Sequence, residues 1–442
     1  MSGSGHYTRL AAALFTAALL AFVIMKPNAG KDAVARVASV AGSVEKTPLS
    51  ARACAIGDPA FSGPFAPIED VLSISPLGGV TAPGEVLPAP YLRINTKKGD
   101  TAFERRTTTA LAPARADIVA LERKIERDPY GRATSQSWTA HFRSCENISF
   151  YYDDIDWISD AILERAGGLN AFTELGGPDH IALETKIRVP ESEIIGETNG
   201  FNVGLHDLAA APKALERPDR YRSNPYARAA ALDAPPSLIE TITLNTAQAR
   251  CAIDYLPKDL QAEWAAKLGD SWGIRKAKGE DACRTALPDE PGAAEGVWHT
   301  DSAHNGATTK ISAIALASDS IDPDRLIFAL HGRLPSLTPS LVAMAPNMDE
   351  ERAEAAKDFL SVIKGDGRIN TPFRAVKDGE VYCYERLRTN FVGPQINGVI
   401  LVQRNGGDGP GALKIEARGD ALSCIDLAEP WVFTGNETVF YR

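Results

Sequence analysis

The sequence predicts a mainly β protein that consists of antiparallel sheets and a few short helices. Two observations indicate this class: short apolar runs recur along most of the chain, and glycine, proline or aspartate turns separate them. A third observation adds one helix, because residues 10–25 (LAAALFTAALLAFVIM) form an uncharged apolar stretch. We therefore expect an N-terminal membrane helix followed by two antiparallel β domains in series.

Length and composition limit the classes of function. The 442 residues are enough for two or three domains, each with a complete core. The chain is 44% hydrophobic and 24% charged, which is ordinary for globular proteins. The formal net charge of −10 argues against nucleic acid or anionic lipid as the main partner, since both select a basic surface.

The apolar stretch 10–25 is bracketed by Arg9 and Lys26. Its length falls between the core of a signal peptide and a full membrane span of roughly 20 residues. We expect an uncleaved signal anchor within residues 1–30, with its N-terminus in the cytoplasm by the positive-inside rule. A cleaved signal peptide is the alternative, and either one places the body of the protein outside the cytoplasm. Residues 31–66 are expected to be a linker.

The six cysteines agree with an oxidising compartment. They are widely spaced and even in number, and none forms a CxxC motif, which argues against zinc knuckles and thioredoxin-like sites. Sequence order suggests three disulfides, one for each region, and six buried free thiols are the alternative. The expected pairs are Cys54–Cys145, Cys251–Cys283 and Cys383–Cys424.

Residues 67–210 are expected to form the first β domain. Ile118, Leu121 and Ile125 have helical spacing, so the residues alone favour a helix over 114–126. A short helix is expected from Ser159 to Leu163, closed by the pair Gly167-Gly168. Strands are expected at Tyr91–Ile94, Thr107–Leu111, Trp138–Phe142 and Ile148–Tyr152.

The stretch Ile74–Ile94 (ISPLGGVTAPGEVLPAPYLRI) opens this domain as a rigid loop that leads into a strand. It resembles the proline- and glycine-rich opening loop of the lysostaphin-type (M23/LytM-like) zinc metallopeptidase domain. In that family the loop delivers the first zinc-binding histidine, and here Glu85 stands at its position. The aspartate expected shortly afterwards falls on Ala89 or Pro90.

Further motifs follow in the order of the family. The run from Tyr151 to Ile155 resembles the "Y-x-H-L" strand and puts Asp153 or Asp154 in place of its histidine. Gly204 stands at the first position of the terminal H-x-H motif, and His206 at the second, metal-binding position. The remaining matches are Ala112-Pro113 as a strand end and Lys186–Gly196 as a turn and strand. The resemblance also implies a strand at 114–126, and we adopt this expectation.

The candidate site residues come from this resemblance. Glu85 and His206 are candidate metal ligands, and Asp153 and Asp154 are candidate catalytic acids. A hydrolytic zinc site needs three protein ligands and one open position for water, so an altered ligand set favours a domain without a cofactor. Zinc is the alternative. The chain contains no HExxH, GxSxG or Walker A motif and no ordered Rossmann fingerprint.

Two further regions complete the chain. In residues 211–290, Cys251–Tyr255 resembles an element that follows the domain in degenerate LytM-like proteins, and Lys258–Leu268 is an expected amphipathic helix. Residues 291–442 are expected to form an antiparallel barrel or sandwich, interrupted by a helix at Asp349–Ile363. Its expected strands are Ile311–Ala317, Leu326–Leu330, Phe373–Val376, Val381–Leu387, Gly398–Gln403, Leu413–Ala417 and Val432–Phe440.

The C-terminal region carries a second, shorter resemblance. Gly296-Val297-Trp298 at its start and Arg442 at its end resemble the G-x-W motif and the closing arginine of lipocalin-type barrels. A barrel of that type would hold an apolar ligand.

Three hypotheses about function follow. The preferred one is a non-enzymatic protein of the cell envelope, periplasmic and anchored to the inner membrane through residues 10–25. It would bind peptidoglycan or envelope proteins, or regulate wall hydrolases, because a ligand groove can outlast its metal. The first alternative is a zinc-dependent wall endopeptidase with altered ligands. The second is a carrier of a small molecule in the C-terminal barrel.

Overall fold

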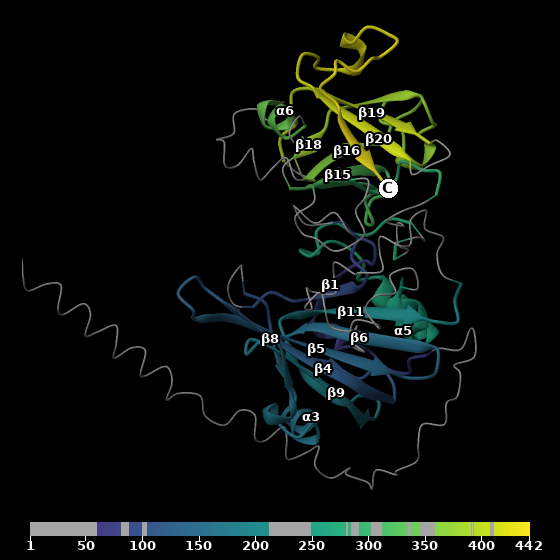
Figure 1. Ribbon diagram of the computed structural model, residues 1–442. Helices are drawn as coiled ribbons and strands as arrows, with labels where there is room; N and C mark the ends of the chain where they lie inside the picture. Colours follow the sequence, from purple (N-terminus) through teal and green to yellow (C-terminus); the bar gives the residue numbers. More distant parts are fainter. Residues whose placement is uncertain are drawn as a thin grey trace, which may run out of the picture. The chain divides into compact units, whose positions relative to one another are not determined.

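The first sheet of the computed structural model is antiparallel and follows the order β1-β2-β11-β6-β5-β4-β9-β8, with β12 paired to β11 (Figure 1). The nine strands of this sheet are β1 (Val71–Ser75), β2 (Leu92–Thr96), β4 (Ala116–Arg127), β5 (Ala133–Arg143), β6 (Ile148–Ile155), β8 (Thr173–Gly177), β9 (His180–Val189), β11 (Gly200–Asp207) and β12 (Ala249–Arg250). The described residues are 60–80, 88–99, 104–211, 249–279, 282–283, 291–301, 312–332, 334, 337–344, 359–389, 391, 393–406 and 411–442. All of them belong to one compact unit, residues 51–442.

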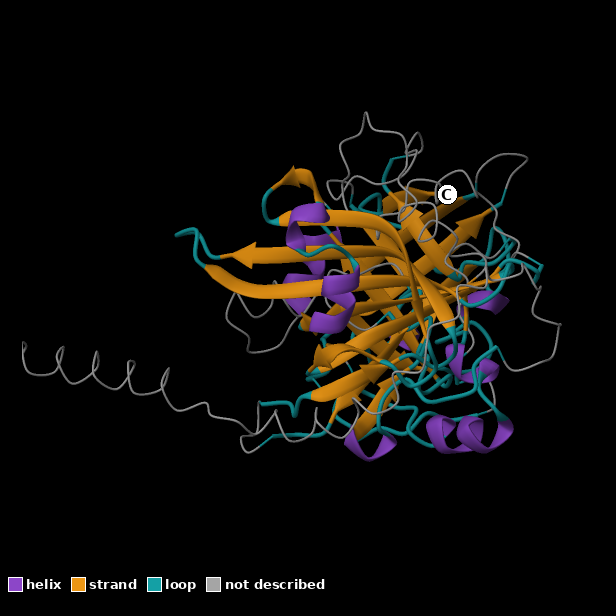
Figure 2. Ribbon diagram, turned by 90° about the horizontal axis from the view of Figure 1, so that it is seen from below, coloured by secondary structure: helices purple, strands orange, loops and turns teal. Residues whose placement is uncertain are grey.

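A small antiparallel sheet and several short helices accompany the first sheet. The small sheet has the order β3-β10-β7, from β3 (Thr108–Leu111), β10 (Ile194–Thr198) and β7 (Trp157–Ile158). Figure 2 shows how few and short the helices are beside the strands. Those of this region are η1 (Ile68–Asp70), α3 (Asp160–Arg165), η2 (Leu169–Ala171), η5 (Ala252–Tyr255) and α5 (Lys258–Ala265).

One face of the first sheet carries the hydrophobic core. The rings of Phe142 and Phe150 stack at 4.5 Å between centroids, and Tyr152 meets Phe201 edge to face at 5.0 Å. From α5, Trp264 packs against Phe65 at 5.0 Å and is fully buried. Side chains alternate along a strand, so the neighbours of these residues point to the opposite face, where the candidate site lies.

The second large sheet, in the C-terminal region, has nine antiparallel strands in the order β17-β19-β20-β21-β13-β14-β15-β16-β18. These are β13 (Gly296–His299), β14 (Ala313–Ser318), β15 (Arg325–His331), β16 (Phe359–Ile363), β17 (Val381–Glu385), β18 (Arg388–Thr389), β19 (Val399–Asn405), β20 (Ala412–Arg418) and β21 (Thr438–Tyr441). Its helices are α6 (Leu337–Met344), η6 (Phe373–Ala375) and η7 (Cys424–Asp426).

The first and last strands of the C-terminal region in sequence, β13 and β21, are neighbours in the middle of this sheet. The guanidinium of Arg442 lies 4.1 Å from the ring centroid of Trp298 and donates to the carbonyl of Glu295. The indole N–H of Trp298 donates to the carbonyl of Ala294 at 2.9 Å. Trp298, Phe328 and Tyr384 are fully buried in the core of this sheet.

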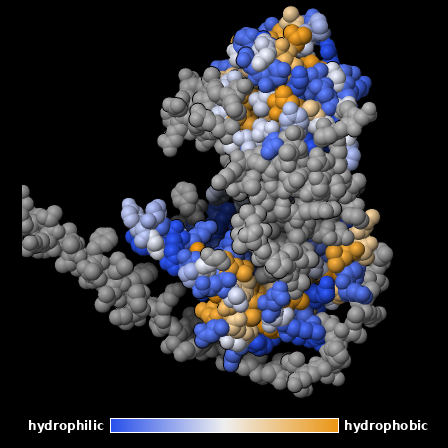
Figure 3. Space-filling view, in the orientation of Figure 1, coloured by the Kyte–Doolittle hydropathy of each residue, from blue (hydrophilic) through white to orange (hydrophobic). Residues whose placement is uncertain are grey.

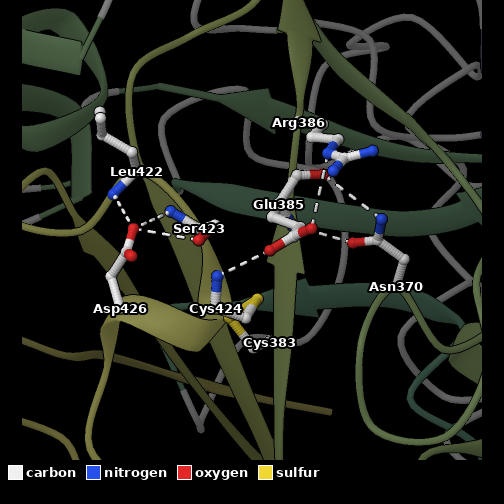
Figure 4. Close-up of a disulfide and its surroundings, with 8 residues drawn as sticks. All are labelled: Asn370, Cys383, Glu385, Arg386, Leu422, Ser423, Cys424 and Asp426. Atoms are coloured by element: carbon white, nitrogen blue, oxygen red, sulfur yellow. Dashed lines mark hydrogen bonds and ion pairs between the residues drawn. A yellow bond between two sulfur atoms is a disulfide. The ribbon is translucent and has the colours of Figure 1, made fainter.

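The expected disulfides are present where the structure describes both cysteines. Cys251–Cys283 and Cys383–Cys424 are bonded, as predicted. Cys145 is also disulfide-bonded, and Cys54, its expected partner, lies outside the described residues. Figure 4 shows how the second bond is held: the backbone N–H of Cys424 donates to the Glu385 carboxylate at 2.7 Å, and Asp426 caps the turn from Leu422 to Cys424.

Most of the expected strands are confirmed. The segment with conflicting patterns, 114–126, is the strand β4, which pairs with β5 and β9 through ten and eight residue pairs. The helix expected after Ser159 is α3, and Gly167 and Gly168 follow it with φ of 89° and 74°. The helix expected at Lys258–Leu268 is α5, which ends at Ala265.

Three expectations in the C-terminal region are wrong. Phe359–Ile363 was expected at the end of a helix beginning at Asp349, but it is the strand β16, held between β15 and β18. Phe373–Ala375 is a 3-10 helix rather than a strand, since Pro372 starts it and Phe373 turns inward as a buried anchor. Of the expected strand Val432–Phe440 only the end is a strand, and Val432 is 65% exposed.

The expected membrane helix at residues 10–25 lies outside the described residues. Among the helices that the structure does describe, none has the length and apolar character needed to cross a bilayer.

Candidate functional site

The face of the first sheet opposite its core is lined with polar side chains at the centre of the sheet. In β11, Val203 and Leu205 point into the core, so Asn202, Gly204 and His206 point to the other face. The register places Asn202 beside Asp153 and Gly204 beside Tyr151 of β6. Tyr151 in turn pairs with His141 of β5. Three neighbouring strands therefore contribute to one polar surface, which we call the polar face.

A hydrogen-bonded network of charged and amide groups occupies one part of the polar face. Asp153 accepts from the Thr139 hydroxyl at 2.6 Å and from the Asn202 amide at 3.3 Å. Arg93 of β2 donates to Asn202 at 3.0 Å and to Asp154 at 2.8 Å. We call these five residues the Arg93–Asp153 network.

The carboxylates of this network differ in their surroundings. Burial raises the pKa of Asp153, and the hydrogen bonds from Thr139 and Asn202 oppose that rise. Asp154 is instead half-exposed in its ion pair with Arg93: the side chains of Arg93 and Asp154 are 40% and 44% exposed. Asp154 also has a φ of 68°, an uncommon conformation for a non-glycine residue, which turns it out of the alternation of β6.

A second polar contact lies on the same face, further along the sheet. Glu122 of β4 is 8% exposed and lies 2.6 Å from the Nε2 atom of His180 in β9. Thr139, which belongs to the Arg93–Asp153 network, is the cross-strand neighbour of Glu122. Polar groups therefore continue across the face from β2 to β9.

Two buried histidines flank Tyr151 on the polar face. The ring centroid of Tyr151 lies 5.8 Å from that of His141 and 5.9 Å from that of His206. His141 is fully buried and His206 is 1% exposed. Both ring nitrogens of each histidine have no hydrogen-bond partner among the described residues. An unpaired buried polar group destabilises the fold, on the order of 1–3 kcal/mol for each group.

The surroundings keep both imidazoles neutral. Burial lowers the pKa of His141 to about 4, and the nearby Glu122 carboxylate only partly opposes this. Burial also lowers the pKa of His206 to about 4, with further lowering from His141 and Arg250. Neutral imidazoles keep a lone pair that can accept a hydrogen bond or bind a metal.

The ring of Tyr151 leaves space only for a glycine at position 204. A Cβ atom at position 204 would lie 2.1 Å from two carbons of the Tyr151 ring, so the ring occupies the space of a side chain. A side chain at position 204 would therefore require the Tyr151 ring to move.

The candidate residues from the sequence are only partly brought together. Asp153 and Asp154 belong to one network. His206 lies on the same face, where its ring contacts that of Tyr151. Tyr151 pairs with Gly204, two residues before His206 in β11. Glu85 lies outside the described residues. Within the described ranges, no group of three or more His, Cys, Asp or Glu side chains is placed to hold a metal ion.

Several residues of the polar face are absent from the sequence predictions. These residues are Arg93, Glu122, Thr139, His141 and Asn202. They come from four different strands, and their meeting depends on strand order and register. A local signal did exist for four of them: Arg93, Thr139, His141 and Asn202 each stand between two apolar residues of a strand.

Comparison of the chain with models of protein families, with curated proteins and with solved structures found no match.

Proposed function

We propose that this protein is an exported cell-envelope protein that binds the peptide part of peptidoglycan through the Arg93–Asp153 network without hydrolysing it. The observation that carries the proposal is the half-exposed pair Arg93 and Asp154, which sits at the edge of an otherwise buried polar network. Wall peptides carry both carboxylate and amine groups. A guanidinium recognises a carboxylate with directed hydrogen bonds, and the Asp154 carboxylate suits an ammonium group.

The buried part of the network supports this role by fixing the exposed part. Asn202 accepts from Arg93 and donates to Asp153, so the guanidinium is tied to the sheet by a chain of hydrogen bonds. Groups that are held in place before binding lose less conformational entropy when a ligand arrives. When a peptide binds, the ion pair between Arg93 and Asp154 would open. Arg93 would then pair with the carboxylate of the peptide, and Asp154 with its ammonium group.

Export and anchoring belong to the same proposal. The disulfides Cys251–Cys283 and Cys383–Cys424 weakly favour an oxidising compartment outside the cytoplasm. Residues 10–25 would anchor the protein in the inner membrane and leave its folded part facing the wall.

The test measures binding of the purified protein to isolated peptidoglycan by sedimentation, and to soluble wall peptides by calorimetry. Arg93→Ala should weaken binding about tenfold, the loss of roughly one charge-assisted hydrogen bond. Arg127→Ala is a matched control, because Arg127 also forms an ion pair with an aspartate, Asp179, and both side chains are similarly exposed at 43% and 36%. Equal binding by the two variants would reject the proposed site.

The same protein sample decides between binding and hydrolysis. Elemental analysis of protein purified without chelators or a histidine tag should find no stoichiometric zinc. About one zinc per chain that is lost in His206→Ala would instead favour the zinc hydrolase. That result would also bring Glu85 forward as a ligand to mutate.

A further inference from the structure

The turn from Asp270 to Arg275, which follows α5, is a rigid projection. The Asp270 carboxylate accepts hydrogen bonds from the backbone N–H groups of Trp272, Ile274 and Arg275, at 3.2, 2.8 and 3.1 Å. Gly269 and Lys276 pair across the base of the turn, and Gly273 at its tip has a φ of 68°. The backbone is therefore fixed, so the side chains at the tip are held in their positions.

The tip of this turn exposes two large apolar side chains. Ile274 is 81% exposed and Trp272 is 48% exposed. On the face drawn in Figure 3, hydrophobic residues occur in groups among hydrophilic ones. The exposed tryptophan and isoleucine on this ordered turn leave apolar surface in contact with water, which is unfavourable. A partner that buries this surface would therefore gain binding free energy.

Cationic side chains surround the turn. The Lys98 ammonium lies 5.6 Å from the ring centroid of Trp272, and the Arg105 guanidinium lies 5.1 Å from it. Arg105 also donates to the carbonyl of Ser271 at 2.8 Å, which joins Arg105 to the turn. Lys97 and Arg106 are the chain neighbours of Lys98 and Arg105. Both are exposed, and neither forms an ion pair with any carboxylate in the described part of the chain.

The charge of this region is opposite to that of the whole chain. Segments 97–106 and 267–278 together contain eight Lys or Arg residues and three Asp or Glu residues, whereas the formal net charge of the chain is −10. Arg275 pairs with Asp319 and Lys278 with Asp322, which leaves the cations near Trp272 as the exposed positive group. The overall charge argues against an anionic partner, but this local surface is cationic.

We propose that the turn 270–275 docks onto the surface of a membrane that contains anionic lipid. Tryptophan is favoured at the boundary between headgroups and acyl chains, where its ring is buried and its N–H remains wet. Ile274 would enter the acyl region beside it, and the exposed lysines and Arg106 would meet anionic headgroups. This contact would come from the folded part of the protein and would add to any anchor at residues 10–25.

The test uses residues 51–442, which form one compact unit with its own cores, so that residues 10–25 cannot cause binding. Sedimentation is measured with vesicles of phosphatidylcholine alone and of phosphatidylcholine mixed with phosphatidylglycerol. We expect binding to the mixed vesicles that decreases with added salt. Trp272→Ala combined with Ile274→Ser should reduce the partition coefficient at least tenfold, and Lys97→Gln combined with Lys98→Gln should reduce the salt-sensitive part.

A matched control removes an equally exposed apolar pair elsewhere. Leu422 and Ile425 are 69% and 88% exposed, so Leu422→Ser combined with Ile425→Ser should leave vesicle binding unchanged. Fluorescence gives a second readout: lipids with brominated acyl chains should quench the wild-type protein, and Trp272→Phe should remove that quenching. Absence of binding in the wild type, or equal losses in the two apolar variants, would overturn the proposal. Neither outcome affects the peptide-binding test, which uses Arg93.

Discussion

His141 and His206 are the residues whose protonation matters most for stability. In the folded protein each stays neutral until the pH falls to about 4, whereas an ordinary histidine of the unfolded chain is protonated below 6.5. The unfolded state therefore binds more protons between these values, and stability should fall as the pH decreases from 6.5 towards 4. At about 1.4 kcal/mol per pH unit, each histidine contributes up to ~3 kcal/mol to this loss.

Chemical denaturation at pH 7.5 and at pH 4.5 measures this effect. His141→Leu combined with His206→Leu should make the stability less dependent on pH, because the variant has no imidazole to protonate in this core. Asp153 acts in the opposite direction, since its raised pKa adds stability as the pH falls, so the comparison is between wild type and variant. Identical pH dependence would show that the two rings are accessible to protons in the folded state.

The contact between Gly204 and Tyr151 makes a second prediction at the scale of residues. Gly204→Ala should destabilise the protein by about 2 kcal/mol, because the new methyl group overlaps the tyrosine ring. In a Tyr151→Ala background the same substitution should be nearly neutral. A double-mutant cycle from urea denaturation measures the coupling. An additive cycle would mean that the ring moves aside freely.

At the scale of secondary-structure elements, the sequence predicted strands well where they alternate and failed where tertiary pairing decides. The segment of β4 has helical spacing but lies between β5 and β9, which supply hydrogen bonds on both sides. Phe359–Ile363 looks like the end of an amphipathic helix, but all but its last residue are buried as part of β16. The spacing of apolar residues within one segment carries no information about which strands will lie beside it. Strand pairing of this kind therefore cannot be predicted from that spacing.

In the candidate site, too, some residues could be predicted from local sequence and others depend on strand pairing. Asp153, Asp154 and His206 were singled out from the sequence because each lies in a short run that was compared with a family motif. Arg93, Thr139 and Asn202 complete the network, but each contributes a single polar residue from a different strand. Only the register of the sheet brings them together, and register depends on contacts that are distant in the sequence.

The disulfide Cys383–Cys424 allows a prediction about the segment that leads from β17 to η7. It closes a loop of 41 residues and belongs to a buried group with Val399, Leu401 and Trp431. Replacing both cysteines by serine should lower the free energy of unfolding by about 4 kcal/mol. Guanidinium denaturation measures it. Replacing Cys251 and Cys283, which are 32 residues apart, by serine should have a similar effect. A decrease in the free energy of unfolding below about 1 kcal/mol would contradict the estimate from chain entropy.

At the scale of the whole molecule, the cysteines link the fold to its compartment. No cysteine that the structure describes is free. Protein taken from the cell envelope should therefore react with a maleimide only after denaturation and reduction. Protein produced in a reducing cytoplasm should show reactive thiols and a lower midpoint of thermal unfolding. Labelling of the native envelope protein without a reductant would contradict the proposed location.

The tyrosine ring over Gly204 also limits how this protein can change over generations. Any side chain at position 204 meets the ring first, so a lineage cannot place a histidine there in one step without damage. A larger residue at position 204 is therefore expected to cost less after Tyr151 has become smaller, but that intermediate has lost a buried aromatic residue. Each order of the two substitutions passes through a less stable protein. Once such a pair is established, drift away from it in either direction is slow.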